Sequence, residues 1–462
     1  MSARLEARQR GVVIATLVLL SWGSLAFGGN YQWAYWPMIV VAAVTGIVGI
    51  CSPAPSSQMA GVIVAGMTVL LAAVVLQLIP LPAPLLSFVS PHADPLLRTL
   101  WVVYAAAPTG SPIAHASSVS PVDTSTAVAF LVSYTLLMLG IARLSYSPLR
   151  LLVRGIVCLG IVLALIGIVQ RPFFTGKVYG FWEPSPPGSS FGPFINKNHF
   201  AGWMTMAIPL ASALAVSAAS RRPSRLRGRG RWLWWTSPDA AGALLAGFGA
   251  ALMSAALLLS LSRSGIVSGL AATCLFAWHL FRSRRQQSQI AALAMLAVAA
   301  VAALAAGVGL DQLIGRFADG STMTLSGRLA TWQQTMAVIR DFPWTGTGIN
   351  TYDIVMRVYQ TIPGDGHLSA AHNDYLQLAA EGGVLVAAPI VLVVGAVVRT
   401  VVRRFEPQPL GSGYWIRVGA VLGLIGIAVQ SLADFSLQMP GNSALFAVIL
   451  GVALHQATVS AK

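Results

Sequence analysis

Long apolar runs with almost no charges follow one another along this chain, and they constrain its fold more than any other feature. A membrane-spanning helix needs about 17–25 mainly apolar residues. Twelve runs of roughly this length occur, at residues 11–28, 33–51, 58–79, 125–142, 151–170, 199–219, 240–261, 264–281, 289–309, 384–402, 413–433 and 443–457. Because a lipid-exposed backbone must satisfy its own hydrogen bonds, we expect an all-α integral membrane protein with about twelve transmembrane helices, forming a single polytopic domain over residues 1–462.

The composition excludes the other main classes of protein. Hydrophobic residues make up 56% of the 462 residues and charged residues 9%, whereas a soluble domain carries about 25% charged residues. A soluble enzyme, a coiled coil and a disordered chain are therefore excluded, and the runs are too continuous for the alternating strands of a transmembrane barrel. Cys51, Cys158 and Cys274 are not clustered and predict neither disulfide bonds nor a zinc site.

The net charge of +15 follows membrane topology and does not indicate a nucleic-acid partner. Twelve spans place both termini on one side, and that side holds 20 of the 29 Lys and Arg but only three of the 14 Asp and Glu. Its net charge is +17, against −2 on the opposite side. Positive residues mark the cytoplasmic side, so both termini are predicted to be cytoplasmic. The first run, 11–28, is interpreted as an uncleaved helix and not as a signal peptide.

Three long loops, 80–124, 171–198 and 310–383, are predicted on the opposite, outward-facing side. The longest has helical patterns of its own, which is typical of a functional loop. One helix begins near Ser326, with its apolar face predicted at Leu329, Trp332, Met336 and Ile339. A tight turn at Gly346-Thr347-Gly348 precedes a second short helix at about Thr351–Thr361. We expect this loop to lie on the membrane surface and cap a cavity.

Two arginines in this frame predict an anionic ligand. Arg263 lies in a turn of about three residues between two apolar runs, and a charge held at a membrane face tends to be functional. Arg328 is expected in the first turn of the loop helix, where the macrodipole disfavours a cation. A snorkelling interface arginine and a solvated helix face, respectively, remain the alternatives.

Two polar segments complete the candidate site. His372, followed by Asn373 and Asp374, stands where the chain re-enters the bilayer, and a histidine there can act as a general base near neutral pH. The alternative is a helix-capping or interfacial histidine. The second segment, Asn196-Lys197-Asn198-His199, suggests sugar or phosphate contacts, although a helix cap with an interfacial anchor explains it as well.

Other motifs contribute less. Gly346-x-Gly348 before a helix could bind a phosphate through backbone amides, but one Gly-x-Gly is a weak signal. No Asp-x-Asp and no His-Glu-x-x-His occurs, so the sequence offers no obvious metal–diphosphate clamp. We therefore predict no metal and no cofactor, with arginines in the place of a metal.

Several of these segments together resemble the bacterial O-antigen ligase/O-antigen polymerase family. The match is strongest over about 190–390 and rests on Phe194-Ile195-Asn196-Lys197-Asn198-His199-Phe200-Ala201-Gly202, Ser262-Arg263-Ser264-Gly265, Gly327-Arg328-Leu329-x-x-Trp332, Pro343-x-x-Gly346-x-Gly348 and His372-Asn373-Asp374-Tyr375-Leu376. Each motif is short, but their order and their common membrane side make the set fairly specific.

The resemblance implies an integral-membrane glycosyltransferase with a GT-C-like helical fold in the bacterial inner membrane. Such enzymes transfer a glycan from undecaprenyl diphosphate to an acceptor hydroxyl at the periplasmic face, with inversion and without a metal. By position, Arg263 and Arg328 would hold the diphosphate and His372 would activate the acceptor. Lys197, Asn198, His199, Asn373 and Asp374 are the further substrate-binding candidates.

The acceptor stays open at this point. It would be lipid A–core for a ligase, a lipid-linked repeat unit for a polymerase, or a protein side chain for a protein glycosylase. A polytopic transporter and a non-catalytic subunit of polysaccharide export are the alternatives outside this class. Transporters often carry internal repeats and polar sites at the membrane midplane, and neither is evident in the sequence.

Overall fold

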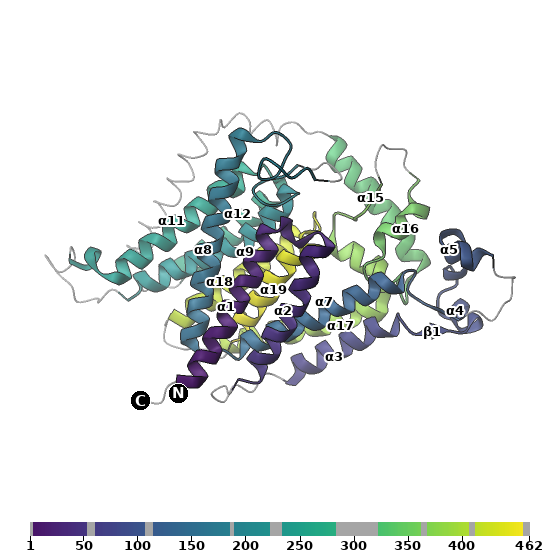
Figure 1. The fold of residues 1–462 in the computed structure, drawn as a ribbon, viewed down its shortest axis with the longest axis horizontal. Helices are drawn as coiled ribbons and strands as arrows, with labels where there is room; N and C mark the ends of the chain where they lie inside the picture. The colour runs from purple at the N-terminus through teal and green to yellow at the C-terminus, as the bar shows by residue number, and fades with distance from the viewer. Residues whose placement is uncertain are drawn as a thin grey trace.

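The computed structural model describes residues 3–52, 61–106, 114–184, 189–221, 233–282, 322–361, 367–405 and 412–455. In this part of the chain the fold is helical (Figure 1), except for one antiparallel pair of two-residue strands, β1 (Pro80–Leu81) and β2 (His115–Ala116). Four short 3-10 turns supplement the helices, η1 (Phe27–Gly29), η2 (Arg171–Phe173), η3 (Trp234–Thr236) and η4 (Ser436–Gln438).

Eleven of the twelve predicted spans coincide with helices. These are α1 (Ala3–Leu25), α2 (Gln32–Ile50), α3 (Gly61–Leu76), α7 (Pro121–Ala142), α8 (Tyr146–Gln170), α9 (Lys197–Ala219), α11 (Pro238–Leu259), α12 (Arg263–Arg282), α17 (Asp374–Arg404), α18 (Ser412–Gln430) and α19 (Pro440–Ala453). The remaining span, 289–309, lies outside the described residues. Eight described helices are long and apolar enough to cross a membrane, while α3 and α19 are shorter apolar helices. The prediction of an all-α integral membrane protein is confirmed.

α9 forms the centre of the bundle. Nearly all of its residues are buried, and it packs against α11 and α18. The contact with α18 is close because two glycines face α9. A Cβ at Gly419 or Gly423 would lie 2.7 Å from a backbone oxygen of that helix. Small residues that let helix backbones approach are typical of helix packing in membranes.

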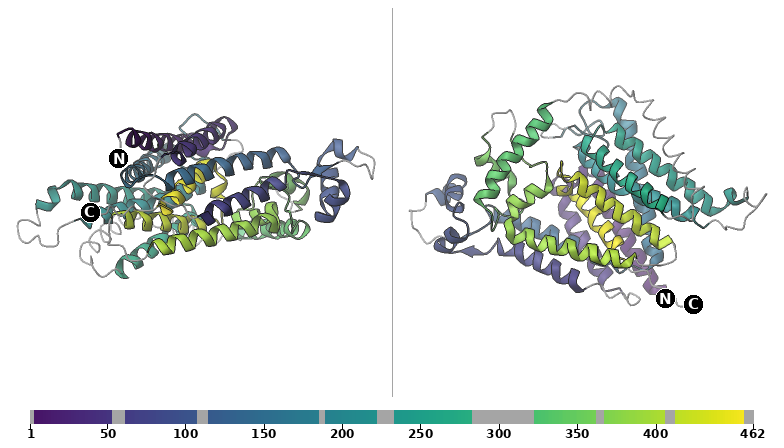
Figure 2. Two further views of the ribbon diagram at one scale, coloured as in Figure 1. Left: turned by 90° about the horizontal axis from the view of Figure 1, so that it is seen from below. Right: turned by 180° about the vertical axis from the view of Figure 1, so that it is seen from behind.

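The C-terminal helices close the bundle against the first half of the chain. α19 packs against α1, α7 and α18, and Figure 2 shows this yellow helix beside elements from both ends of the colour bar. The candidate site therefore draws on segments that are far apart in the sequence.

Two of the predicted loops combine into one small helical unit, which we call the helical cap. It contains α4 (Ala83–Val89), α5 (Ala93–Leu100), α6 (Val102–Ala105), α15 (Thr322–Asp341) and α16 (Tyr352–Tyr359), seen on the right of Figure 1. The cap has its own apolar core, which includes Leu86, Leu97, Phe342, Tyr352 and Met356. The sequence predicted both loops but not their union.

The loop helices are confirmed, and Leu329, Trp332, Met336 and Ile339 share one face of α15 as predicted, but this face is not the buried one. Leu329 and Met336 are exposed, and Trp332 and Ile339 are only partly buried. The buried side of α15 carries Thr331, Gln334, Thr335 and Val338 instead. The reason is that polar bonds hold this helix in the cap. The hydroxyls of Thr335 and Tyr352, for example, lie 2.7 Å apart in a hydrogen bond.

Candidate functional site

The predicted site residues gather at the first residues of three helices. Lys197, Asn198 and His199 form the first turn of α9, Arg263 is the first residue of α12, and His372 and Asn373 directly precede α17 at Asp374. The residue directly before each helix caps its N-terminus with its side chain. The amide of Asn198 donates to Asn196 Oδ1 (2.9 Å), that of Gly265 to Ser262 Oγ (3.3 Å), and those of Tyr375 and Leu376 to Asn373 Oδ1 (3.0 and 3.1 Å). Asn and Ser are preferred caps, and helix N-termini favour negative charge nearby.

Direct hydrogen bonds hold the starts of α9 and α12 together. Ser262 Oγ donates to Asn198 Oδ1 over 2.7 Å, so Arg263 lies one residue from a contact with α9. The turn before α12 is tight, as predicted, and Leu261 in it has a positive φ of 54°. Since Arg263 is the first residue of α12, the macrodipole argument made for Arg328 applies to Arg263 instead.

The connection between α18 and α19 joins the starts of α9 and α17. Ser436 Oγ donates to the backbone oxygen of Asn198 (3.2 Å). On the other side, Asn373 Nδ2 donates to the Leu432 carbonyl (3.0 Å), and the Asp374 amide donates to the Ser431 carbonyl (3.0 Å). These bonds place His372 beside the end of α18.

Among the residues that the structure describes, Asp434, which was not predicted, is the acid nearest to His372. Its carboxylate is fully buried, and Oδ1 lies 3.9 Å from His372 Nδ1. Between the two candidate histidines lies Phe435, whose ring centroid is 4.8 Å from that of His199 and 4.9 Å from that of His372. Burial alone would raise the pKa of Asp434, but His372, His199 and the Phe435 amide outweigh it, and the pKa lies below its usual value. Asp434 is thus an anion facing the candidate base.

Arg328 lies on α15, a helix that contacts the same region through Trp332. Trp332, one helical turn further along, donates from Nε1 to the Ala371 carbonyl (3.0 Å), directly before His372. Within the described part of the chain the Arg328 side chain has no hydrogen-bond or ion-pair partner. The prediction that Arg328 occupies the first turn of its helix is wrong, because α15 begins at Thr322 and Arg328 lies in its second turn.

The turn at Gly346-Thr347-Gly348, a weak candidate for phosphate binding in the sequence, is hydrogen-bonded within the protein. The amides of Gly346, Thr347 and Gly348 donate to the carbonyls of Phe342 (3.1 Å), Ala380 (3.1 Å) and Glu381 (2.9 Å). These donors are therefore already used by the protein. The glycines serve close packing: both have positive φ, and a Cβ on Gly346 would lie 2.2 Å from the Glu381 carbonyl oxygen.

Asn373 and Asp374 both have partners within the protein. Besides the contacts above, the Asp374 carboxylate accepts from Ser431 Oγ (2.8 Å) and Gln438 Nε2 (3.0 Å). Their role in substrate binding stays a prediction, and the bonds give both residues a part in building the site. No group of three or more His, Cys, Asp or Glu that could hold a metal ion occurs among the described residues.

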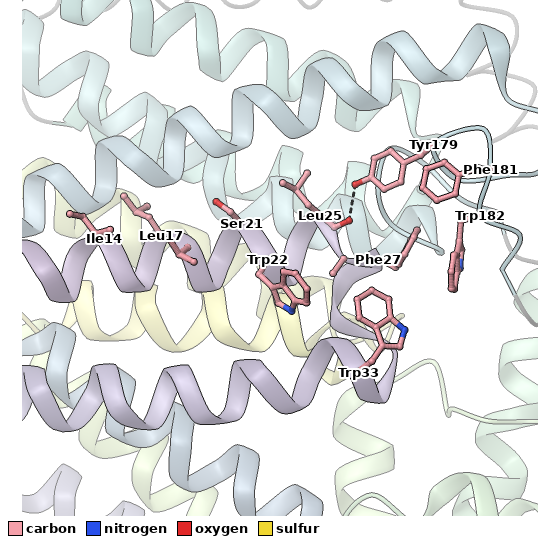
Figure 3. A pocket seen from close by; sticks show the side chains of 12 residues that line it. Ile14, Leu17, Ser21, Trp22, Leu25, Phe27, Trp33, Tyr179, Phe181 and Trp182 are labelled. Atoms are coloured by element: carbon pink, nitrogen blue, oxygen red, sulfur yellow. Dashed lines mark hydrogen bonds between the residues drawn. The ribbon is translucent and has the colours of Figure 1, made fainter.

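An apolar groove lies apart from these residues, along α1 (Figure 3). It has a volume of about 750 Å³ and is lined by α1, the start of α2 and the loop after α8. At one end, Tyr179 Oη donates to the Leu25 carbonyl over 2.7 Å, and Phe181 and Trp182 lie beside it. None of the predicted site residues lines this groove.

The fold and the site define a multi-pass helical membrane protein whose polar residues collect at the starts of helices. In a comparison with known families, residues 248–391 match the family model described as O-antigen ligase. This match, over less than half of the chain, confirms the predicted resemblance to the O-antigen ligase/polymerase family. The matched residues include Arg263, Arg328 and His372 but not Lys197 or Asp434. No curated protein matches the chain.

Proposed function

We propose that this protein is a glycosyltransferase that moves a glycan from undecaprenyl diphosphate to an acceptor hydroxyl at the periplasmic face of the inner membrane. The observation that carries the proposal is the placement of His372 beside buried Asp434 (3.9 Å), linked by short contacts to the helix starts that bear Arg263 and Lys197. The match to the O-antigen ligase family supports a glycan-transferring membrane enzyme.

The cationic residues would act on the leaving group. Breaking the sugar–phosphate bond leaves negative charge on the diphosphate, and fixed cations stabilise charge where it develops. Arg263 and Lys197 are the first residues of α12 and α9, so the positive ends of both helices add to their charge. Arg328 approaches on α15. In this proposal the arginines take the place of a metal ion.

His372 would remove the proton from the acceptor hydroxyl. Its side chain is 37% exposed, so an acceptor can reach it, while Asp434 behind it is fully buried. At 3.9 Å the Asp434 carboxylate is too far from His372 Nδ1 for a hydrogen bond, and it would stabilise by its charge the imidazolium that forms. A well-placed general base contributes about 10²–10⁴-fold to the rate. Direct attack of the acceptor on the donor sugar, opposite the diphosphate, would invert the anomeric carbon.

The test is a transfer assay with the purified protein in liposomes. The donor is an undecaprenyl-diphosphate-linked repeat unit, supplied with and without lipid A–core, and the products are resolved on a gel. A ladder from donor alone indicates a polymerase, and a shifted band that requires lipid A–core indicates a ligase. A product found only with an added protein acceptor indicates a protein glycosylase.

Single substitutions test the assigned roles in the same assay. Arg263→Ala and Arg328→Ala should each lower the rate by about 10²–10³-fold, the usual effect of losing one donor to a developing anion. Arg357→Ala is the matched control, because Arg357 belongs to an exposed ion pair with Asp353 on α16. If both arginine variants and His372→Ala reach the membrane and keep the rate of the control, the proposed function is wrong.

A further inference from the structure

Ala371, the residue before His372, is held from two different helices. Ala371 is fully buried, and its carbonyl accepts from Trp332 Nε1 of α15 over 3.0 Å. Its amide donates to Gln377 Oε1 of α17, also over 3.0 Å. Both polar groups of the residue that precedes the candidate base therefore bond to side chains from outside its own loop.

His372 needs such support because its backbone is strained. It is one of few described non-glycine residues with a positive φ, here 51°. A side chain in this region persists only where the surroundings over-determine the conformation, and such residues cluster at functional sites. The two bonds to Ala371, together with the capping bonds of Asn373, fix the chain on both sides of His372.

Gln377 can adopt only one orientation of its amide. While Oε1 accepts from Ala371, Nε2 donates to Glu381 Oε1 (3.2 Å) and Gln438 Oε1 (3.0 Å). A flipped amide would point its NH₂ group at the Ala371 N–H and its oxygen at the Glu381 carboxylate. The side chain is buried, so water cannot replace these partners. The acceptor atom for Ala371 is thus fixed in space.

Trp332, which bonds the Ala371 carbonyl, lies one helical turn from Arg328 on α15. Residues four apart on a helix lie on the same face, about one turn from each other, so the side chain that bonds Ala371 is the neighbour of the Arg328 side chain on α15. The bond therefore sets where α15, and with it Arg328, stands relative to His372. We infer that Trp332 and Gln377 are positioning residues that hold His372 and Arg328 in register for transfer. This inference rests on the proposed function.

The test uses Trp332→Phe and Gln377→Met, which keep most of the side-chain volume and remove the polar atoms. Each has a matched control with the same kind of bond elsewhere. Trp101 Nε1 donates to the Val119 carbonyl (2.9 Å) in the cap, and Gln9 Oε1 accepts from the Ser145 amide (3.1 Å) in the bundle. The controls are Trp101→Phe and Gln9→Met, assayed in the same liposomes.

We expect Trp332→Phe and Gln377→Met to lower kcat by roughly 10–100-fold, since a misplacement of about 1 Å in a catalytic group can cost 10²-fold. KM for the donor should change less than threefold, and both controls should stay within twofold of wild type. In combination with His372→Ala, Gln377→Met should cause no further loss, because residues that act as a unit are non-additive. Trp332→Phe should keep the part of its effect that acts through Arg328.

The outcomes separate the inference from the proposed function. If His372→Ala is inactive while Trp332→Phe keeps its kcat, the inference is wrong and the proposed function stands. If His372→Ala is fully active, His372 is not the base and the inference falls, and the proposed function falls too when both arginine variants are also fully active. A loss by Gln377→Met that multiplies with that of His372→Ala, or a loss by either variant that appears in KM alone, overturns the positioning role. Trp332→Phe retains an aromatic ring, so it decides the question even if Gln377→Met fails to fold.

Discussion

Replacing Glu381 with alanine should loosen α16 and leave the membrane helices intact. The Glu381 carboxylate is buried on α17 and reaches across to the start of α16. It accepts from the amides of Tyr352 (2.9 Å) and Asn350 (3.0 Å), and from Gln377 Nε2 (3.2 Å). A carboxylate at a helix N-terminus stabilises the helix through these amides and through the macrodipole.

The loss of stability in Glu381→Ala follows from the hydrogen bond that each donor loses. Tyr352 N–H is buried, and leaving a buried donor unsatisfied costs about 1–3 kcal/mol. The Asn350 amide is partly exposed, so water can replace the carboxylate there, and Gln377 keeps its bond to Gln438. The local stability of α16 should therefore fall by about 1–3 kcal/mol, equivalent to an equilibrium change of roughly 5–150-fold.

Hydrogen exchange followed by mass spectrometry measures this change locally. Peptides that cover α16 should exchange roughly 5–150-fold faster in Glu381→Ala, while those from α2 and α7 should be unchanged. The control is Arg357→Ala on the same helix, whose ion pair with Asp353 is exposed and worth only about 0–1 kcal/mol. If α16 exchanges at the same rate in both variants, Glu381 does not stabilise the cap and the reasoning is refuted.

Two further predictions concern stability in detergent. The pKa of Asp434 is lowered in the folded protein, so its stabilising contribution is complete above the usual value of 3.8 and is lost as the pH falls below it. The melting temperature of Asp434→Asn should therefore lie below that of wild type at pH 7, and the difference should shrink below pH 3.8; a pH-independent difference would contradict this. Gly346→Ala should destabilise by about 2 kcal/mol or more, through its positive φ and overpacking against Glu381. Gly327→Ala, with no described atom within 4 Å of the added Cβ, should be neutral or stabilising, and equal melting temperatures for the two alanine variants would contradict the packing argument.

The sequence was sufficient to predict the membrane helices, but it was insufficient to predict which side of α15 is buried in the cap. Apolar runs predicted α9, α11 and α12 almost to their ends, because lipid imposes both length and composition on a helix. No such constraint acts on α15. Its buried side carries Thr331 and Thr335, which a search for apolar periodicity cannot find.

In the candidate site, too, some residues could be predicted from the sequence and others could not. Arg263, Arg328 and His372 were predicted because charged or titratable residues near membrane boundaries are conspicuous in sequence. Asp434 was missed, although an acid directly after the predicted span 413–433 was a usable signal. Gln377 could not be recognised, since its bond to the Ala371 amide depends on the loop conformation before α17, and its partner Gln438 is brought near only by the folded chain.

The distribution of charge suggests how one site could serve both halves of a transfer reaction. Asp374 and Asp434 would repel a diphosphate, but both carboxylates accept hydrogen bonds from the connection after α18. Asp374 accepts from Ser431 Oγ (2.8 Å), and Asp434 accepts from the Phe435 amide (2.9 Å). The cations stand instead at the first residues of α9 and α12. On the proposed function, the donor would leave its diphosphate at these helix starts, and the acceptor would meet His372 on the acidic side. Separating the charges in this way allows the base to keep an anionic partner while the leaving group meets only positive charge.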